Sequence, residues 1–77
     1  MVVTIYTTST CPWCGVAKQY FKDKEVDFRE VNVQHDQEAA REMISKSGQM
    51  GVPVIDINGV IIVGFDQSRI DNALNLN

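Results

Sequence analysis

Two cysteines, separated by two residues, are the side chains of this sequence best suited to covalent chemistry. They are Cys11 and Cys14 of the segment "CPWC", and the 77-residue chain has no others. A close thiol pair can contribute to a metal site, act as a structural staple, or open and close as a redox pair. A disulfide across so short a loop removes little entropy from the unfolded chain, so the staple is a weak hypothesis.

A metal site at this pair would need further ligands from elsewhere in the sequence. Structural zinc normally takes four nitrogen or sulfur ligands. The chain offers Cys11, Cys14 and one histidine, His35, with carboxylates as the other candidates. We therefore expect no metal ligands here, and we expect His35 to be a solvated loop residue. An iron–sulfur cluster held between two chains, each giving thiolates, stays open as an alternative.

The cysteine pair is predicted to begin a helix. Pro12 suits the first helical position, because its missing N–H would be unpaired there. Cys11 then becomes the N-cap, and the amides of Trp13 and Cys14 face its sulfur. These amides and the helix dipole favour a thiolate, since helix N-termini lower the pKa of a thiol from about 8.5 to about 3.5–7.5. Cys11 is thus the predicted nucleophile, and the less exposed Cys14 the resolving thiol.

The apolar pattern around this helix predicts a strand on each side of it. Residues 2–6, "VVTIY", are typical of an interior strand buried on both faces. Residues 12–24 predict an amphipathic helix with an apolar stripe, and residues 27–33 a second strand with Val31 and Val33 on one side. The stripe of the helix consists of Trp13, Val16, Ala17, Tyr20 and Phe21.

The second half of the chain predicts a helix, a hairpin and a last helix. The helix runs over residues 36–46, with Asp36 as N-cap, Gly48 as its stop, and Met43 and Ile44 in the core. Two apolar runs, "VIDI" and "VIIV", flank Asn58-Gly59, which is the sequence of a tight hairpin. The last helix is capped by Asp66 and carries the apolar residues Ile70, Ala73 and Leu74. The order is β-α-β-α-β-β-α, with a parallel right-handed first crossover.

Composition limits the kind of protein that this chain can be. Its length fits one domain over residues 1–77, and 44% hydrophobic residues indicate a globular chain. The net charge is -3 and the seven basic residues are scattered, so no nucleic-acid surface is expected. The first apolar run has no preceding basic segment and is too short for a signal peptide or membrane span, so we expect a cytoplasmic protein. There, a close cysteine pair points to catalysis or metal binding.

The chain resembles a glutaredoxin, within the thioredoxin-like superfamily, over essentially its whole length. The likeness depends on "CPWC" after the first strand, "GVPVI" before the third and "VGFD" before the last helix. It implies an α/β thioredoxin-like fold, with a four-stranded mixed sheet flanked by three helices. It also implies a thiol–disulfide oxidoreductase that reduces protein or glutathione mixed disulfides, with a reduction potential of about −200 to −230 mV.

The resemblance also assigns residues to a substrate groove. A cis bond at Val52–Pro53 would turn the Val52 backbone toward Cys11, where it could pair with the extended backbone of a thiol substrate. The corner "VGFD" would hold the γ-glutamyl end of glutathione. The predicted substrate-binding residues are Pro12, Trp13, Val52, Pro53, Gly64, Phe65 and Asp66.

Several positions differ from the glutathione-binding pattern of that family. They are Thr8, Gln49, Met50, Gly51, Val63 and Gln67. A related branch, the redoxins that serve ribonucleotide reductase, draws electrons from thioredoxin reductase, and "GF" in its corner is similar to Gly64-Phe65. We expect a monomer with no bound cofactor, reduced by glutathione or by a flavoprotein thiol reductase and acting on disulfide-containing proteins. Lys18 is expected to face solvent.

Overall fold

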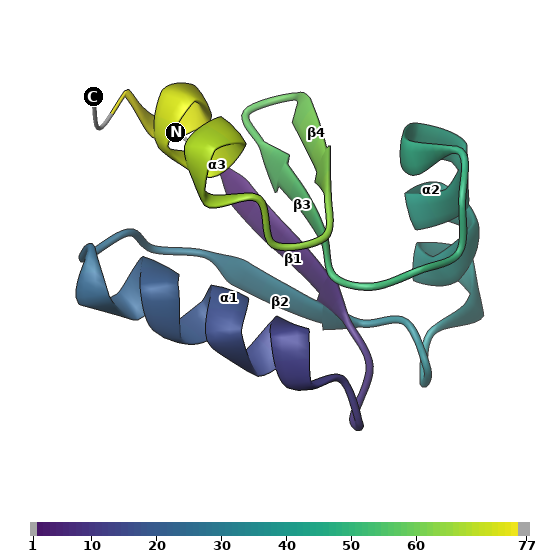
Figure 1. The fold of residues 1–77 in the computed structure, drawn as a ribbon. Helices are drawn as coiled ribbons and strands as arrows, with labels where there is room; N and C mark the ends of the chain where they lie inside the picture. Colours follow the sequence, from purple (N-terminus) through teal and green to yellow (C-terminus); the bar gives the residue numbers. More distant parts are fainter. Residues whose placement is uncertain (1, 76–77) are drawn as a thin grey trace.

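The chain folds into a four-stranded sheet with helices on both of its faces (Figure 1). The computed structural model describes residues 2–75. The predicted order of elements is confirmed, and their bounds are β1 Val3–Thr7, α1 Pro12–Asp23, β2 Arg29–Asn32, α2 Gln37–Ser47, β3 Val54–Ile57, β4 Val60–Val63 and α3 Gln67–Leu74. Within residues 2–75, no helix is long and apolar enough to cross a membrane.

The sheet is mixed, with strand order β2-β1-β3-β4. β1 pairs in parallel with β2, as the first crossover requires, and antiparallel with β3. β3 and β4 form the predicted hairpin, in which Asn58 and Gly59 both have positive φ. β1 is therefore an interior strand, and its carboxyl end delivers the chain to the cysteine motif.

Two apolar clusters hold the helices against the sheet. The larger cluster lies between the sheet and the helices α1 and α3, and the smaller one lies under α2 on the opposite face. Because side chains alternate along β1, Val3 and Ile5 enter the first cluster while Tyr6 enters the second. Val31 and Val33 both pack against the second cluster, in agreement with the prediction that they lie on the same side of the second strand.

The predicted helix ends are confirmed by their hydrogen bonds. The Asp36 carboxylate accepts from the Ala39 amide at 3.0 Å, and Gly48 ends α2 with φ +75°. Asp66 caps α3 and accepts from the Arg69 amide at 3.2 Å. These caps fix where α2 and α3 begin.

The predicted apolar stripe of α1 is wider than the face that the structure buries. Ala17 and Phe21 are buried, whereas Trp13 is 60% exposed and Val16 is 44% exposed. The prediction that Ile44 lies in the core is wrong, because Ile44 is 36% exposed, whereas the neighbouring Met43 is 2% exposed. Only a narrow stripe of side chains on each of these two helices packs against the sheet.

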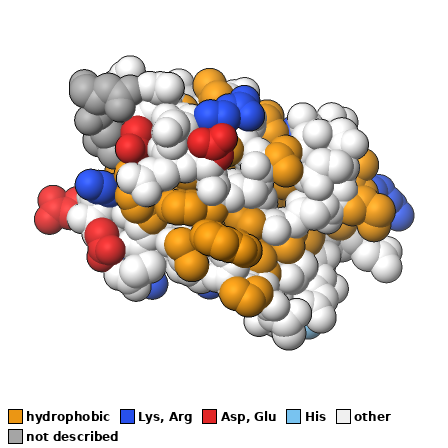
Figure 2. Space-filling model, viewed as in Figure 1, with side chains coloured by type: hydrophobic (Ala, Val, Ile, Leu, Met, Phe, Trp, Pro, Cys, Tyr) orange, Lys and Arg blue, Asp and Glu red, His pale blue; other side chains and the backbone are white. Residues whose placement is uncertain are grey.

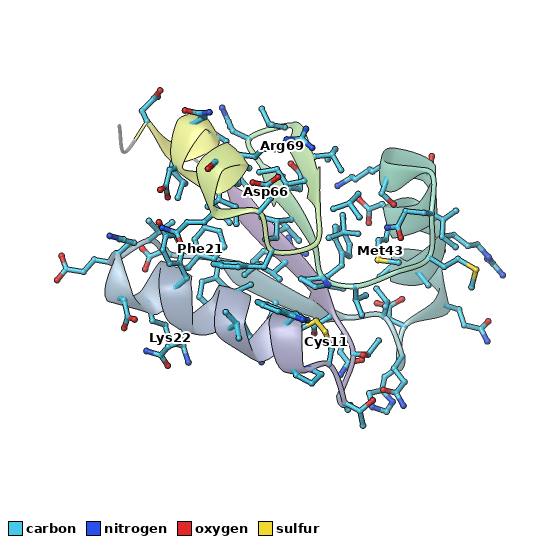
Figure 3. All side chains as sticks on the ribbon, in the orientation of Figure 1. Cys11, Phe21, Lys22, Met43, Asp66 and Arg69 are labelled. Carbon is cyan, nitrogen blue, oxygen red and sulfur yellow. A yellow bond between two sulfur atoms is a disulfide. The ribbon has the colours of Figure 1, made fainter. Side chains whose placement is uncertain are left out.

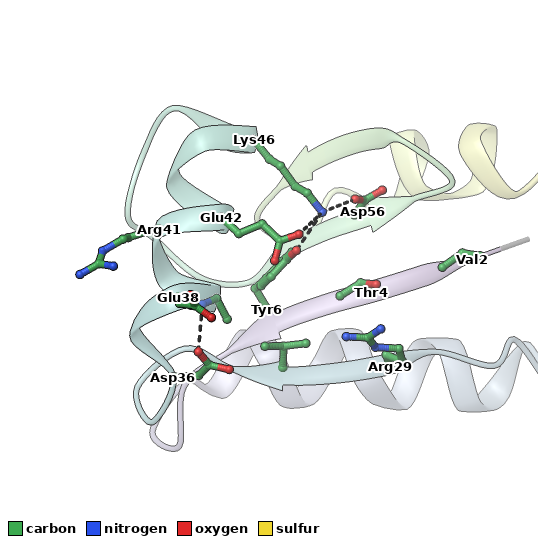
Figure 4. Close-up of a pocket in the computed structure, with 12 residues that line it drawn as sticks. Val2, Thr4, Tyr6, Arg29, Asp36, Glu38, Arg41, Glu42, Lys46 and Asp56 are labelled. Carbon is green, nitrogen blue, oxygen red and sulfur yellow. Dashed lines mark hydrogen bonds and ion pairs between the residues drawn. The ribbon is translucent and has the colours of Figure 1, made fainter.

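A lysine anchors α2 to the strands below it (Figure 4). Lys46 Nζ donates to the Asp56 carboxylate at 2.8 Å and to the Tyr6 hydroxyl at 2.9 Å. It also pairs with Glu42 on the same helix at 3.3 Å. The hydrogen bond to Asp56, followed by the one to Tyr6, raises the pKa of Lys46, so the ammonium form is retained over the neutral range.

Candidate redox-active site

The two cysteines form a disulfide at the start of α1 (Figure 3). Cys11 is the N-cap residue with an extended backbone, and Pro12 occupies the first turn. The Cys14 amide donates to Cys11 Sγ at 3.1 Å. The sulfur thus takes the place of the oxygen in an ordinary N-cap, and the same amide can stabilise a negative charge on it.

The two sulfur-bearing residues differ in their exposure to solvent. Cys14 is 1% exposed, on the inner face of α1 with Ala17 and Phe21. Cys11 is partly exposed at the N-terminal end of α1. An incoming disulfide can therefore reach Cys11 but not Cys14, which is the asymmetry that an attacking and a resolving thiol need.

The corner, residues 63–66, and the proline segment, Val52 and Pro53, lie next to each other and next to the cysteine motif. The Val52–Pro53 peptide bond is cis, and Pro53 is buried. The Gly64 amide donates to the Pro53 carbonyl at 2.8 Å, and Gly64 has φ +78°, which favours glycine. The Phe65 ring stacks on Trp13 of the motif, with ring centroids 6.2 Å apart.

An apolar surface extends from the motif between α1 and α3 (Figure 2). We call Trp13, Val16, Tyr20 and Phe65 the aromatic patch. Tyr20 contacts Phe65 edge to face at 5.5 Å between centroids, and its hydroxyl bonds Asp71 of α3. A shallow groove of about 360 Å³ lies over Val16, Tyr20 and Phe65, with Gln19, Asp23 and Gln67 also lining it. Asp23 and Asp71 thus place carboxyl groups beside this apolar surface.

The loop that precedes the cis proline, residues 49–51, is closed on itself by side-chain hydrogen bonds. The Gln49 side chain accepts from the Gly51 amide at 2.6 Å and donates to the Gly51 carbonyl at 3.1 Å. The space next to Gly51 is filled by that side chain, since a Cβ there would lie 2.7 Å from Gln49 Oε1. The Gln49 amide is therefore engaged within its own loop.

Two polar contacts near the site were missed by sequence reasoning. Lys18 does not simply face solvent: its Nζ lies 3.0 Å from Glu30 Oε2, an oxygen that also accepts from Thr7 at 2.9 Å. His35 lies in an exposed loop, as expected, but its Nε2 is 3.5 Å from the Ser9 hydroxyl in the loop before Cys11. A periodic pattern carries no signal for such contacts between distant segments.

Metal-ligating side chains do not gather in the part of the chain that the structure describes. Over residues 2–75, no three His, Cys, Asp or Glu side chains could hold one ion.

Comparison with known proteins agrees with this site. Residues 3–62 match the glutaredoxin family model. An uncharacterized glutaredoxin-like 8.6 kDa protein in the rubredoxin operon of Clostridium pasteurianum is 51% identical over 73 residues, with 95% of this chain and 97% of the relative covered. Glutaredoxin 3 of Escherichia coli K12 is 41% identical over 64 residues, covering 83% and 77% of the two chains.

Solved structures show the same fold. The glutaredoxin-like NrdH-redoxin of Escherichia coli superposes with a TM-score of 0.85 at 29% identity, covering 94% of this chain and 93% of that one. The predicted thioredoxin-like fold, with three helices around a four-stranded mixed sheet, is thereby confirmed. With the family match over residues 3–62 and the Cys11–Cys14 pair at the start of α1, the chain belongs to the glutaredoxin family.

Proposed function

We propose that this protein is a thiol–disulfide oxidoreductase that reduces disulfide bonds of proteins and mixed disulfides of glutathione. One observation carries the proposal: Cys11 Sγ caps α1 and accepts the Cys14 amide at 3.1 Å. An amide held in this position stabilises the thiolate that attacks, without further rearrangement.

The reaction divides between the two thiols. The Cys11 thiolate attacks one sulfur of the substrate disulfide, and the other sulfur leaves as a thiolate. The Cys14 sulfur then attacks Cys11 in the mixed disulfide, which releases the reduced substrate and leaves the Cys11–Cys14 disulfide seen here. An external reductant restores the dithiol, so no bound cofactor is required.

We propose that the substrate lies along the proline segment and the corner. The hydrogen bond from Gly64 to Pro53 and the ring contact between Trp13 and Phe65 support this, because they join these segments into one surface beside Cys11. The Val52 backbone would pair with the extended chain of the substrate. The amides at the start of α3, next to Gly64 and Phe65, would receive a γ-glutamyl carboxylate, with Asp66 bonding its amino group.

A second candidate is a redoxin reduced by a flavoprotein thioredoxin reductase. The aromatic patch favours it, because a large exposed apolar surface beside a reactive group is typical of a protein partner. The engaged Gln49 amide also favours it, since this amide is not free to bind the glycine carboxylate of glutathione. The structural neighbour described as a glutaredoxin-like protein with a thioredoxin-like activity profile supports the same candidate.

Two coupled assays separate the electron donors. In one, NADPH consumption is followed with glutathione and glutathione reductase, and in the other with thioredoxin reductase, each with a disulfide-containing protein as substrate. We expect the protein to support turnover in at least one assay, and the faster assay identifies its donor.

Cysteine variants provide the controls for both assays. Cys11→Ser is expected to abolish turnover, because it removes the attacking sulfur. If wild-type protein consumes no more NADPH than Cys11→Ser in either assay, the proposed function is wrong. An absorbance spectrum of protein purified without oxygen tests the alternative of a shared iron–sulfur cluster, which would colour a dimeric sample.

A further inference from the structure

The loop that joins α2 to β3 contains a hydrogen-bond network that the exchange reaction described above does not use. The Gln49 side chain accepts from the Gly51 amide at 2.6 Å and donates to the Gly51 carbonyl at 3.1 Å. Its nitrogen also donates to the Ser47 hydroxyl at 3.3 Å. That hydroxyl donates in turn to the Met43 carbonyl at 2.7 Å. The network thus connects the last turn of α2 to the residue that precedes Val52.

The Gln49 carboxamide binds Gly51 in the way that a neighbouring strand would. It meets both the N–H and the C=O of one residue, as the opposite residue does in a hydrogen-bonded pair of an antiparallel sheet. Gly51 is exposed, and glycine has more backbone freedom than any other residue. Two hydrogen bonds from one side chain therefore order a residue whose own stereochemistry does not fix it.

On the other side of Gly51, the chain is held by the core and by the corner. The Val52 side chain packs against the second apolar cluster, under α2, and Pro53 is buried. The Gly64 amide fixes the Pro53 carbonyl at 2.8 Å. The Val52 backbone, which is the proposed pairing partner of the substrate, is thus anchored on its carboxyl side. On its amino side it is anchored through Gly51 by the Gln49 side chain.

The space beside Gly51 shows how closely the Gln49 carboxamide fits. A Cβ at position 51 would lie 2.7 Å from Gln49 Oε1 and 3.8 Å from Gln49 Cδ. Within the described residues, the chain neighbours aside, no other heavy atom would lie within 4 Å of it. The backbone of Gly51 is outside the left-handed region, so its conformation is open to alanine. The Gln49 carboxamide is therefore the obstacle to a side chain at position 51.

We propose, on the basis of the function proposed above, that Gln49 and Ser47 are positioning residues that hold the Val52 backbone ready to pair with the extended chain around a substrate disulfide. A backbone that is ordered in advance loses less conformational entropy when the substrate binds, so pairing is stronger. The network therefore favours disulfides carried by an extended peptide over disulfides without a peptide backbone. It acts on substrate binding rather than on the Cys11 thiolate, because its hydrogen bonds are confined to residues 43–51.

Two mixed disulfides with the same leaving group isolate the contribution of the substrate backbone. In one probe, the cysteine of a short extended peptide is joined to a chromogenic aromatic thiol, and in the other, mercaptoethanol replaces the peptide. The Cys11 thiolate forms a bond to the alkyl sulfur as the disulfide bond of the probe breaks, and that electron pair leaves with the coloured aromatic thiolate. Stopped-flow mixing with reduced protein gives a second-order rate constant for each probe. The ratio of the two constants measures recognition of the peptide.

Gln49→Ala should lower the rate constant for the peptide probe by about five- to thirtyfold. This range corresponds to about 1–2 kcal/mol, the cost of ordering the backbone of one residue. The mercaptoethanol probe should react within about twofold of wild type, since it has no backbone to pair, whereas a purely structural defect would slow both probes. Gln37→Ala, which replaces an exposed glutamine at the start of α2, is the matched control and should leave both rate constants unchanged. Thermal melts report whether each variant folds.

Gly51→Ala gives a second test, whose outcome depends on the background. In the wild-type background, the new methyl group must displace the Gln49 carboxamide, so the peptide probe should slow about as much as it does in Gln49→Ala. In the Gln49→Ala background, the obstacle is absent and alanine restricts the loop backbone. There, Gly51→Ala should cause no further loss for the peptide probe, or restore part of the rate constant.

Three results would overturn the positioning role of the network. They are an unchanged rate constant for the peptide probe in Gln49→Ala, equal losses for the two probes in that variant, and losses that multiply when Gln49→Ala and Gly51→Ala are combined. A wild-type protein that releases no aromatic thiolate from either probe would instead contradict the proposed function, because the reaction with mercaptoethanol depends on Cys11 and not on the loop.

Discussion

Replacing Lys46 by methionine should destabilise the fold without touching the cysteines. Methionine keeps the apolar stem of the lysine but loses its hydrogen bonds to Asp56 at 2.8 Å and to Tyr6 at 2.9 Å. A hydrogen bond to a charged group contributes about 1.5–3 kcal/mol when measured singly. Because the two bonds share one ammonium group that is 30% exposed, we expect a combined loss of about 2 kcal/mol rather than their sum.

That loss is large for a domain of this size. Native stability of about 0.05–0.15 kcal/mol per residue gives the chain roughly 4–12 kcal/mol. A change of about 2 kcal/mol should lower Tm by about 8–16 °C. Urea unfolding of Lys46→Met and wild type at neutral pH measures the difference. Glu42→Gln is the matched control: its ion pair to Lys46 spans 3.3 Å with a side chain that is 57% exposed, so its cost should stay below about 0.5 kcal/mol.

The same comparison depends on pH in a defined direction. Burial would raise the pKa of Asp56, but hydrogen bonds from Lys46 and from the Gly59 amide outweigh it and hold that pKa below its ordinary value. A carboxyl group whose pKa is lowered by folding contributes stability above its unfolded pKa and loses it as the pH falls through the folded value. The gap between wild type and Lys46→Met should therefore narrow below about pH 4. A gap that is negligible at neutral pH, or unchanged in acid, would refute this reasoning.

Three further predictions concern the site. Cys14→Ser should accumulate a mixed disulfide on Cys11, because the resolving sulfur is missing. Mass spectrometry after reaction with a disulfide substrate should detect this adduct, and recovery of unmodified protein would contradict the assigned roles. Asp66→Ala should cost about 1 kcal/mol of unfolding free energy by removing the α3 cap, whereas Asp66→Asn should retain it; equal losses in urea unfolding would show that charge rather than capping matters. Trp13→Ala should lower kcat/KM for a protein disulfide by about tenfold or more with little change in Tm, since the ring is 60% exposed; an unchanged kcat/KM would remove the aromatic patch from the partner surface.

The backbone of the fold was predictable because local signals agreed with one another. Asn58-Gly59 between two apolar runs fixed the hairpin, and Asp36 and Asp66 marked the helix starts through their capping bonds. Pro12 after Cys11 placed the cysteine at an N-cap, where its sulfur accepts the amide that was expected from position 14. Signals of this kind act within a few residues of the chain, so they can be read without knowledge of the tertiary structure.

The interpretation was weaker wherever tertiary contacts decide the outcome. Periodicity shows which side of a helix is apolar but not how much of it the core covers. Trp13 and Val16 lie on the apolar stripe of α1, and Ile44 was expected in the core, yet the structure leaves all three exposed. The contact of Lys18 with Glu30 has no local signal in the sequence, since Glu30 lies 12 positions away on a strand. The cis bond at Val52–Pro53 came from family resemblance, since X–Pro bonds are cis in only about 5–6% of cases.

The proposed chemistry depends most directly on the ionisation of the Cys11 thiol in the reduced protein. The rate at which a small alkylating agent modifies Cys11 can be followed across pH, with peptide mass spectrometry to distinguish it from Cys14. A sulfur held by the start of α1 should reach half its maximal rate below about pH 7.5, with Cys14 largely protected by burial. A midpoint near pH 8.5, typical of a free thiol, with equal modification of both cysteines, would contradict the assignment of Cys11 as the attacking group.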